Sequence, residues 1–280
     1  MRTAGLVAIA VAALAADSGA YQREIAKWRA ERETKLKADD GWLTVVGLHW
    51  LHEGVNTVGS DPYTDAPLPP SLPAMVGTIA LKKGKVHFKP APGIQLKEMD
   101  LKTDITPEYD RVSLGRVKFF VIERENRFGV RVKDNDSEAR RKFAGLRWYP
   151  VDPAWKIKAK FIPSPHKVTF DTEVGVKEQD DSPGFVTFTR GGKEYKMEPV
   201  TEDDHLWFVF RDQTSGKTTY GASRFLYVPM PKDGFVEVDF NKAENPPCVF
   251  TDYATCPLPT PQNRLSLPVT AGEQMYRRPQ

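Results

Sequence analysis

Hydrophobic and polar positions alternate in short segments over most of the chain, which predicts β-strands. In FGVRVKD (residues 128–134), Phe, Val and Val alternate with Gly, Arg and Lys, the pattern of a half-buried strand with one face packed. Similar short runs, separated by turn residues, occur at 42–51, 76–89, 94–101 and 117–124. Repeated short strands of this kind indicate a sandwich or a barrel.

One segment has the period of a helix instead. In YQREIAKWRAERETKLKAD (residues 21–39), Tyr21, Ile25, Trp28 and Leu36 lie near one stripe, and the other faces are charged. The stripe is narrow, whereas a helix lying on a membrane has a broader apolar face. We therefore predict a helix that packs on a β domain.

The second half also has the pattern of an all-β structure. Residues 135–155 interrupt the strands with charged and aromatic residues, and strand-like runs resume until about residue 240. The predicted fold class is mainly β, with an N-terminal helix, a β-sandwich-like module and a second antiparallel β module that is a sandwich or barrel. The expected segments are a signal peptide at 1–20, the helix at 21–40, the first β module at 41–134, a connector at 135–155, and the second β module with a C-terminal loop at 156–280.

The first twenty residues have the layout of a secretory signal peptide. Arg2 precedes an uncharged run from Ala4 to Ala16, and small residues offer cleavage after Ala15, Ala16 or Ala20. The run is shorter than the ~20 residues of a membrane span. The alternative is an anchor that is not cleaved. We expect an exported protein, periplasmic or extracellular, with no membrane span in the mature chain.

Composition and charge exclude some partners. The formal net charge is +3, and basic and acidic residues are interspersed along the chain. Because a basic block is absent from the sequence, nothing favours nucleic acid as a partner. The sequence also indicates no cofactor and no metal site. The 23 prolines are typical of a protein with many turns.

The two cysteines of the chain, Cys248 and Cys256, lie in one proline-rich segment, NPPCVFTDYATC. In an oxidising compartment they can form a disulfide that closes a short loop and contributes roughly 2–3 kcal/mol. Free thiols and a metal or redox pair are the alternatives. Seven intervening residues suit neither a zinc site nor a C-x-x-C catalyst. We predict a structural disulfide.

The second half resembles a known family. Residues 206–273, which begin LWFVFRDQTSGKTTYGASRFLYVP and end PQNRLSLPVTAGE, are similar to the signature of the bacterial and archaeal family called domain of unknown function 1684. GWLTVVGLHWLHEGVNTVGSDP (41–62) and LRWYPVDPAW (146–155) match it too. The resemblance implies no activity and no catalytic residues, because the family has no established function.

The first half has a weaker likeness to forkhead-associated β-sandwiches. VNTVGSDPYTDAPLP, GTIALKKGKVHFKP and DRVSLGRVKFFV follow the order of such a domain. Ser60 stands where that family has its phosphate-binding arginine. The likeness therefore implies a fold and does not imply phosphothreonine binding.

A set of polar residues within the family signature provides the candidate ligand site: Arg211, Asp212, Tyr220, Arg224, Asp239, Asn241, Asn245, Asn263 and Arg264. Buried charges of this kind must be paired, so one interpretation is an Arg–Asp network that ties the C-terminal loop to the β module. The other is a pocket that binds a carboxylate, a phosphate or a sugar, with Trp207 and Tyr227 as a stacking wall.

Two further possibilities involve histidines and carboxylates. His49 and His52 could share a metal on a helix but face opposite ways on a strand, and we interpret them as structural. His166 and His205 could each act as a general base. A hydrolase acting on a glycan or an ester through Asp212, Asp239 and His205 is the alternative to a binding or structural module. It requires both carboxylates in one open cleft.

Overall fold

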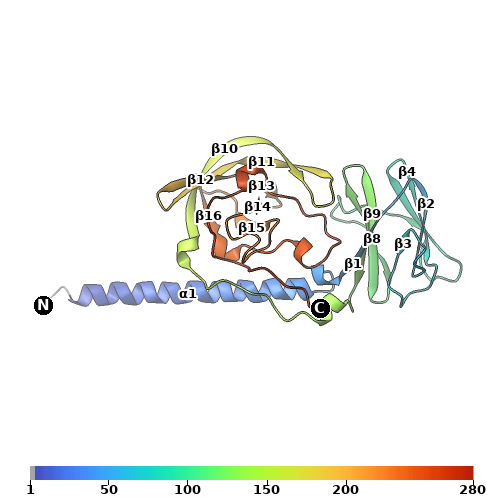
Figure 1. Cartoon of the computed structure of the whole chain (residues 1–280), viewed down its shortest axis with the longest axis horizontal. Helices are drawn as coiled ribbons and strands as arrows, with labels where there is room; N and C mark the ends of the chain where they lie inside the picture. The colour runs from blue at the N-terminus through green and yellow to red at the C-terminus, as the bar shows by residue number, and fades with distance from the viewer. Residues whose placement is uncertain (1–3, 280) are drawn as a thin grey trace.

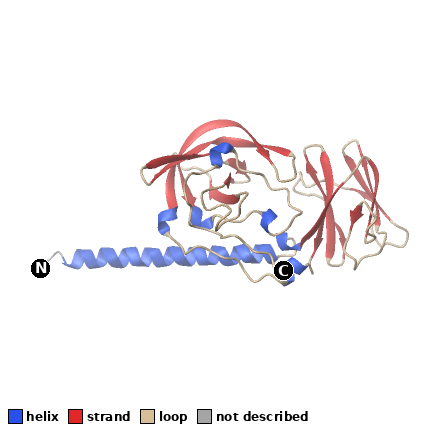
Figure 2. Cartoon of the chain, in the orientation of Figure 1, coloured by secondary structure: helices blue, strands red, loops and turns tan. Residues whose placement is uncertain are grey.

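A computed structural model describes the backbone of residues 4–279 and the side chains of residues 19–279 (Figure 1). The chain is mainly β, with one long N-terminal helix and several sheets whose strands are nearly all antiparallel (Figure 2). The prediction of a mainly β fold is confirmed. In the described part of the chain, no sheet is closed into a barrel.

Helix α1 (Ala4–Lys37) begins earlier than the predicted helix over residues 21–39, because the alanine-rich residues before it also favour a helix. Ile25 and Leu36 of the predicted stripe are buried, and Leu36 packs with Leu43 of η1 and with Val249 and Phe250 of the C-terminal loop. The Tyr21 hydroxyl donates to the Asp239 carboxylate at 2.8 Å. The leader predicted over residues 1–20 lies almost wholly outside the residues whose side chains are described.

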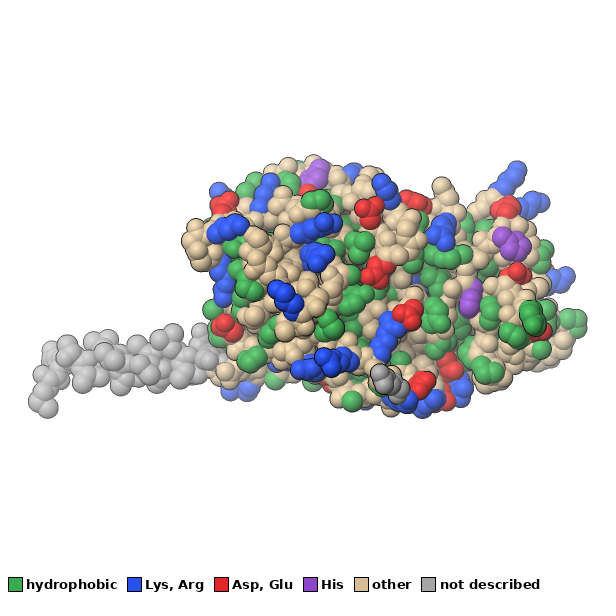
Figure 3. Space-filling model, in the orientation of Figure 1, with side chains coloured by type: hydrophobic (Ala, Val, Ile, Leu, Met, Phe, Trp, Pro, Cys, Tyr) green, Lys and Arg blue, Asp and Glu red, His purple; other side chains and the backbone are tan. Residues whose placement is uncertain are grey.

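Among the described residues, none of the helices combines the length and apolarity needed to cross a membrane. Figure 3 shows basic and acidic side chains interspersed over the visible face of the molecule.

Residues 45–134 form two sheets that pack face to face, called here the N-terminal sandwich. One sheet has the order β1 (Val45–Trp50), β9 (Arg127–Asp134), β8 (Val117–Arg124), β7 (Val112–Leu114). The other has the order β3 (Ala66–Pro67), β2 (Gly54–Gly59), β4 (Gly77–Lys82), β5 (Lys85–Pro90), β6 (Met99–Asp100). Phe88 and Phe119 meet edge to face in the core between them, 5.7 Å apart. Lys83 and Gly84 join β4 to β5 with φ of 51° and 76°, as a tight hairpin requires.

Between the sandwich and the second set of sheets lie the short helix α2 (Glu138–Arg141) and the 3₁₀ turn η2 (Pro153–Trp155). A four-stranded sheet follows, in the order β12 (Lys193–Met197), β11 (Lys177–Arg190), β10 (Lys156–Asp171), β16 (Phe235–Asp239). A three-stranded sheet consists of β13 (Val200–Glu202), β14 (His205–Phe210) and β15 (Arg224–Pro229). We call these two sheets the second β body. Phe188, Phe208, Phe210 and Phe240 lie in the core that they share.

The remaining regular elements are 3₁₀ turns: η1 (Trp42–Thr44), η3 (Phe240–Lys242), η4 (Pro247–Val249) and η5 (Pro261–Asn263). Strands β10 and β11 are long, and they arch over the sheet β13-β14-β15 toward β8 and β9 (Figure 1). The end of this arch reaches the N-terminal sandwich, because Glu178 of β11 pairs with Arg124 of β8 at 3.2 Å. The two β structures therefore meet along this junction.

Candidate functional site

A cavity of about 1010 Å³ lies at the junction of the two β structures, and we call it the cleft. The sheet β1-β9-β8-β7 forms one side, the ends of β10 and β11 form another, and the sheet β13-β14-β15 forms a third. The C-terminal loop and the end of α1 complete it. The lining residues that the site depends on are Arg32, Trp42, Asp104, Tyr109, Phe120, Arg124, Arg131, Lys133, Glu178, Asp180, Glu202, Trp207, Phe225, Tyr227, Glu244, Thr255 and Cys256.

Strand β9 supplies the cationic side of the cleft. Its apolar residues point into the core of the N-terminal sandwich, as the alternation predicts. The other face, however, does not meet open solvent. Arg131 and Lys133 are only 4% and 9% exposed. Arg131 packs over Trp42, whereas Lys133 lies over Phe120 and bonds to the backbone of the turn before η1, and both residues line the cleft. The half-buried interpretation of this strand was therefore wrong, and both of its faces are buried.

Arg131 is a buried cation with unused hydrogen-bonding capacity. Its Nε and Nη2 atoms have no hydrogen-bond partner. The guanidinium lies over the Trp42 ring, 5.3 Å from its centroid. Burial, and to a lesser extent the neighbouring Arg124, lower the pKa of Arg131 to about 10, although the charges of Asp104 and Glu178 oppose this shift. A buried guanidinium left in this way is costly, since each unsatisfied charged donor forfeits more than an ordinary hydrogen bond.

Lys133 lies two residues further along the same face of β9. Its Nζ donates to the backbone oxygen of Asp40 at 2.7 Å and lies 5.6 Å from the centre of the Phe120 ring. Burial lowers the pKa of Lys133 to about 8, while Asp40 raises it and Arg131 lowers it. Two cations thus lie side by side in a partly apolar setting, and an anion between them would lower the free energy of both.

Arg124 differs from these two cations because carboxylates already neutralise it. Asp104 accepts two hydrogen bonds from its guanidinium, both at 2.9 Å, and Glu178 lies 3.2 Å from its Nε. The same Nε donates to the Thr255 hydroxyl at 3.2 Å. This residue holds the sandwich to β11 and to the C-terminal loop, and it leaves Arg131 as the cation in need of a partner.

An aromatic wall stands beside the charged groups. Trp207 and Tyr227 stack with their ring centres 6.0 Å apart and their planes at 4°, and Phe225 meets Trp207 edge to face at 4.9 Å. Trp207 and Tyr227, the rings named from the sequence as a stacking wall, therefore lie together in the lining of the cleft, and their stacking on a ligand stays a prediction. The Trp207 Nε1 atom is buried and has no hydrogen-bond partner. Flat rings with an unused N–H suit a planar or sugar-like portion of a ligand.

Carboxylates from other segments line the same cleft, among them Glu244. Arg32 of α1 lies between two carboxylates, with its Nε 3.2 Å from Glu244 and 3.0 Å from Glu273. Glu273 also accepts the Asn245 backbone N–H at 2.8 Å and is fully buried, whereas Glu244 faces the cleft. Burial raises the pKa of Glu244 to about 7, Arg32 lowers it, and the Glu273 carboxylate raises it. One guanidinium cannot neutralise two carboxylates, so the Glu244 carboxyl retains a proton to near neutral pH.

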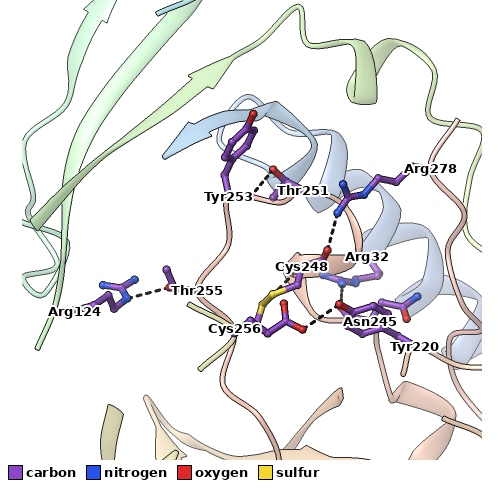
Figure 4. The surroundings of a disulfide bond; sticks show 11 residues. Arg32, Arg124, Tyr220, Asn245, Cys248, Thr251, Tyr253, Thr255, Cys256 and Arg278 are labelled. Carbon is purple, nitrogen blue, oxygen red and sulfur yellow. Dashed lines mark hydrogen bonds between the residues drawn. A yellow bond between two sulfur atoms is a disulfide. The ribbon is translucent and has the colours of Figure 1, made fainter. Parts of the chain in front are cut away.

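The C-terminal loop forms the remaining wall, and a disulfide fixes it. Cys248 and Cys256 are bonded, with their Cα atoms 6.3 Å apart, which confirms the predicted pair. Figure 4 shows the loop between them held from several directions. Arg278 donates to the Cys248 oxygen at 2.8 Å, and Thr255 receives the Arg124 hydrogen bond described above. The disulfide thus places Thr255 and Cys256 at the edge of the cleft.

The nine polar residues predicted from the sequence do not gather round one cavity. Arg224 and Asp212 form an ion pair at 2.6 Å, and both side chains are 0% exposed. Arg224 also donates to the backbone oxygens of Val269 and Ala271, at 3.0 and 2.7 Å. These contacts have the form of the structural network, in which an Arg–Asp pair ties the C-terminal loop to β15.

The three asparagines of that set are fully buried and bond mainly to backbone groups. Asn263 bonds to both the N–H and the carbonyl of Glu198, at 2.8 Å each. Asn241 bonds to the backbone of Asp152, and Asn245 bonds to the carbonyl of Gln274.

The other four residues of the set are dispersed. Tyr220, Asp239 and Arg264 line three different cavities, none of them the cleft, and Arg211 is exposed. A ligand-binding role for this set stays a prediction, without a common cavity to support it.

The groups named for hydrolysis are separated as well. Asp212 is enclosed with Arg224, and Asp239 accepts from Tyr21 and from the Asn241 backbone. His205 pairs with Asp204 at 2.6 Å on the surface. Because the Asp212 carboxylate has no access to solvent, it cannot attack or protonate a substrate. The hydrolase alternative required Asp212 and Asp239 in one open cleft, and the buried Asp212 does not meet that requirement.

The other histidines each have local partners. His166 lies 2.9 Å from Glu198, and His52 lies 3.6 Å from Asp65. His87 lies 2.8 Å from Asp100, and His49, half-buried on β1, bonds to the Pro67 backbone. Within the described residues, no group of three or more His, Cys, Asp or Glu side chains is arranged to hold a metal ion.

Sequence reasoning missed Arg131, Lys133 and Glu244. The sequence FGVRVKD did indicate a cationic patch, since two cations two residues apart lie on the same strand face. What covers that face comes from residues more than forty positions away along the chain, which periodicity does not reveal. No pattern in the sequence indicated a role for Glu244, because its neighbours Arg32 and Glu273 are distant in sequence.

The chain is similar to a protein family and to solved structures. Residues 141–274 match the family described as "Protein of unknown function (DUF1684)". This confirms the resemblance predicted for the second half. The chain is also similar to an uncharacterized protein of Haloarcula marismortui with a solution NMR structure, at 28% identity and a TM-score of 0.41, covering 48% of this chain and 78% of that one. No curated protein matches the chain.

Proposed function

We propose that this chain, whose residues 141–274 match the DUF1684 family, is a ligand-binding protein whose cleft holds an organic anion. The anionic group would lie against Arg131 and Lys133, and the body of the ligand would lie against Trp207 and Tyr227. Carboxylates and phosphates share the required chemistry, because both offer several acceptor oxygens to a guanidinium. The cleft also has the size usual for small-molecule sites.

The observation that carries this proposal is the state of Arg131. It is 4% exposed, its Nε and Nη2 atoms lack partners, and it lines a cavity of about 1010 Å³. Folded chains retain a buried, unsatisfied cation at the expense of stability, and functional sites are where such costs are found. Arg124 lines the same cleft but has two carboxylate partners, as expected for an arginine with a structural role, whereas Arg131 has none within hydrogen-bonding distance of its Nε and Nη2 atoms.

Replacing Arg131 by methionine is expected to weaken anion binding by roughly 10–100-fold, because a charged hydrogen bond contributes about 1.5–3 kcal/mol. The same variant without ligand should be more stable than the wild type by about 1–3 kcal/mol, since an apolar side chain does not leave donors unsatisfied. Calorimetric titration with benzoate, phenylacetate and phenyl phosphate, beside neutral benzyl alcohol, measures the first effect. Urea unfolding measures the second.

Arg127→Gln is the matched control, because Arg127 lies on the same strand but stacks on Trp50 outside the cleft. It should bind the anions as the wild type does. If none of the anions binds the wild type, or if Arg131→Met binds them equally well, the proposal is wrong.

Export is proposed on separate grounds. The leader pattern of residues 1–20 and the disulfide between Cys248 and Cys256 both fit an oxidising compartment. Tyr21, just after the last expected cleavage position, bonds to Asp239, so a chain trimmed after Ala20 keeps this contact.

The full-length gene product expressed in a bacterial host is expected in the periplasm or medium, with a mass that lacks the leader and with no free thiol. Intact mass spectrometry after thiol alkylation tests both features. A cytoplasmic product with its first residues intact and two alkylated thiols would contradict export.

A further inference from the structure

We infer that the ligand of the cleft is an oxo acid and that the Lys133 amine adds to its carbonyl carbon to form an imine. This inference rests on the proposed anion site, in which Arg131 holds the carboxylate, and it assigns a nucleophile to the same cavity. Both residues line the cleft and lie two positions apart on one face of β9. A carboxylate bound by Arg131 would therefore bring a nearby carbonyl group close to the amine.

Lys133 is a buried lysine without a carboxylate partner. Its Nζ donates to the backbone oxygen of Asp40 at 2.7 Å and lies 5.6 Å from the centre of the Phe120 ring. Within the described part of the chain, it forms no ion pair with an Asp or Glu side chain. The Asp40 carboxylate instead lies 3.6 Å from Lys118, which stands opposite Lys133 on β8. Lys133 thus lacks the counter-ion that would keep a buried amine protonated.

The surroundings of this amine favour its neutral form. Burial lowers the pKa of Lys133 to about 8. The nearby cations that act in the same direction are Arg131, Arg111 and Lys118, and the Asp40 charge opposes them. Lysines that serve as nucleophiles are placed in this way, desolvated or next to another cation. Near pH 8 about half of the molecules therefore hold a free amine at this position.

The reaction is a condensation that consumes no oxidant and no reductant. The Nζ lone pair attacks the carbonyl carbon, so that a C–N bond forms and the π-bond of the carbonyl breaks. The carbonyl oxygen then leaves as water with the two protons of the amine, which gives the imine. During the attack Lys133 can keep its bond to Asp40, since that bond uses an N–H and not the lone pair.

Reductive trapping on the wild-type chain tests the inference. Pyruvate, acetoacetate and levulinate, which differ in the spacing between carbonyl and carboxylate, are each incubated with the protein and sodium cyanoborohydride at a pH of about 8. The neutral control is 2-pentanone, in which a methyl group replaces the carboxylate of levulinate. Intact mass spectrometry should show a single adduct, whose added mass is that of the oxo acid less one oxygen atom. Peptide mapping should place the adduct on Lys133.

The rate of labelling measures the contribution of the carboxylate. With at least one oxo acid, Lys133 should be labelled about tenfold faster or more than with 2-pentanone, as expected for a charge-assisted hydrogen bond to Arg131. Arg131→Met should remove this preference. Lys177 lines the same cleft but is exposed, and it is the internal reference that should stay largely unlabelled.

Two matched variants locate the amine. Lys133→Arg keeps the positive charge but has no nucleophilic amine, so it should lose the adduct. Lys118→Arg makes the same change on the neighbouring strand, outside the cleft lining, and should keep full labelling.

The outcomes separate the two proposals. If the aryl anions of the earlier titration bind in an Arg131-dependent manner but no adduct forms on Lys133, the anion site stands and the imine is wrong. The same holds if the adduct survives in Lys133→Arg, or if no oxo acid labels Lys133 faster than 2-pentanone does. If neither the aryl anions nor the oxo acids bind, the anion site itself is wrong, and this inference is wrong with it.

Discussion

Asp212→Asn is expected to lower the free energy of unfolding by about 3–5 kcal/mol, because it leaves the Arg224 charge buried without a counter-ion. Both side chains are 0% exposed, and their contact is 2.6 Å. Asparagine retains an oxygen that can accept from the Thr214 and Val269 N–H groups, which now donate to Asp212. The loss should therefore arise from the charge and not from a broken turn. Urea unfolding at neutral pH measures it.

A double variant that combines Asp212→Asn with Arg224→Met removes both charges and should recover at least half of that loss, since buried ion pairs are often replaceable by uncharged groups. Asp181→Asn breaks the exposed pair with Lys167 and should cost less than about 1 kcal/mol. A loss below about 1 kcal/mol for Asp212→Asn would mean that the buried pair does not hold the C-terminal loop.

The stability of the wild type is expected to fall as pH rises through the range in which Glu244 ionises. The pKa of Glu244 is raised from 4.5 to about 7 in the folded chain, chiefly by burial. The folded state therefore holds this proton more tightly than the unfolded state does. The resulting stability is fully present below pH 4.5 and is lost by the time pH exceeds about 7. The contribution is at most about 3 kcal/mol. Asp180, Glu202 and Glu273, whose pKa values are also raised, act in the same direction.

Glu244→Gln isolates this contribution, because glutamine imitates the protonated acid and can still accept from Arg32. Denaturant unfolding at pH values from about 4.5 to about 8 should show that the wild type loses more stability than Glu244→Gln as pH rises. Glu194→Gln, outside the cleft, should follow the wild type. Parallel pH profiles for the wild type and Glu244→Gln would contradict a raised pKa for Glu244.

The cleft depends on the C-terminal loop as much as on the sheets. The loop contributes Thr255 and Cys256 to the wall of the cleft. The Glu273 carboxylate, near the end of the chain, is buried beside Arg32 of α1. Helix, arch and loop therefore meet at one site, so unfolding of any one of them would open it. This arrangement explains why polar residues of the family signature, such as Asn263 and Arg224, serve mainly to hold backbone segments in place.

Local patterns in the sequence were sufficient to predict several features. The alternation of FGVRVKD, the helical stripe that includes Ile25 and Leu36, and the two cysteines in one short loop depend on neighbours within a few residues. Strand, helix and disulfide are all confirmed. The start of the helix was predicted less accurately. The pattern placed it at residue 21, whereas α1 begins at Ala4.

The candidate site could not be predicted in the same way. Sequence reasoning selected charged residues that interrupt apolar strands, and some of those, such as Arg224 and Asp212, form an ion pair with one another inside the second β body. Arg131 looked like an ordinary outward residue of a half-buried strand. Whether a cation faces water, a carboxylate or an empty cavity depends on which distant segment packs over it.

The amino-acid order alone therefore determined the class of fold, the main elements and the covalent link between Cys248 and Cys256, because short-range periodicity and spacing control these. Only the tertiary structure decided that Arg131 and Lys133 line a cavity shared with the second β body and that Glu244 shares its counter-ion with Glu273. The physical reason is that burial and charge pairing are properties of packed surfaces, which bring together residues from α1, β9, β13 and the C-terminal loop.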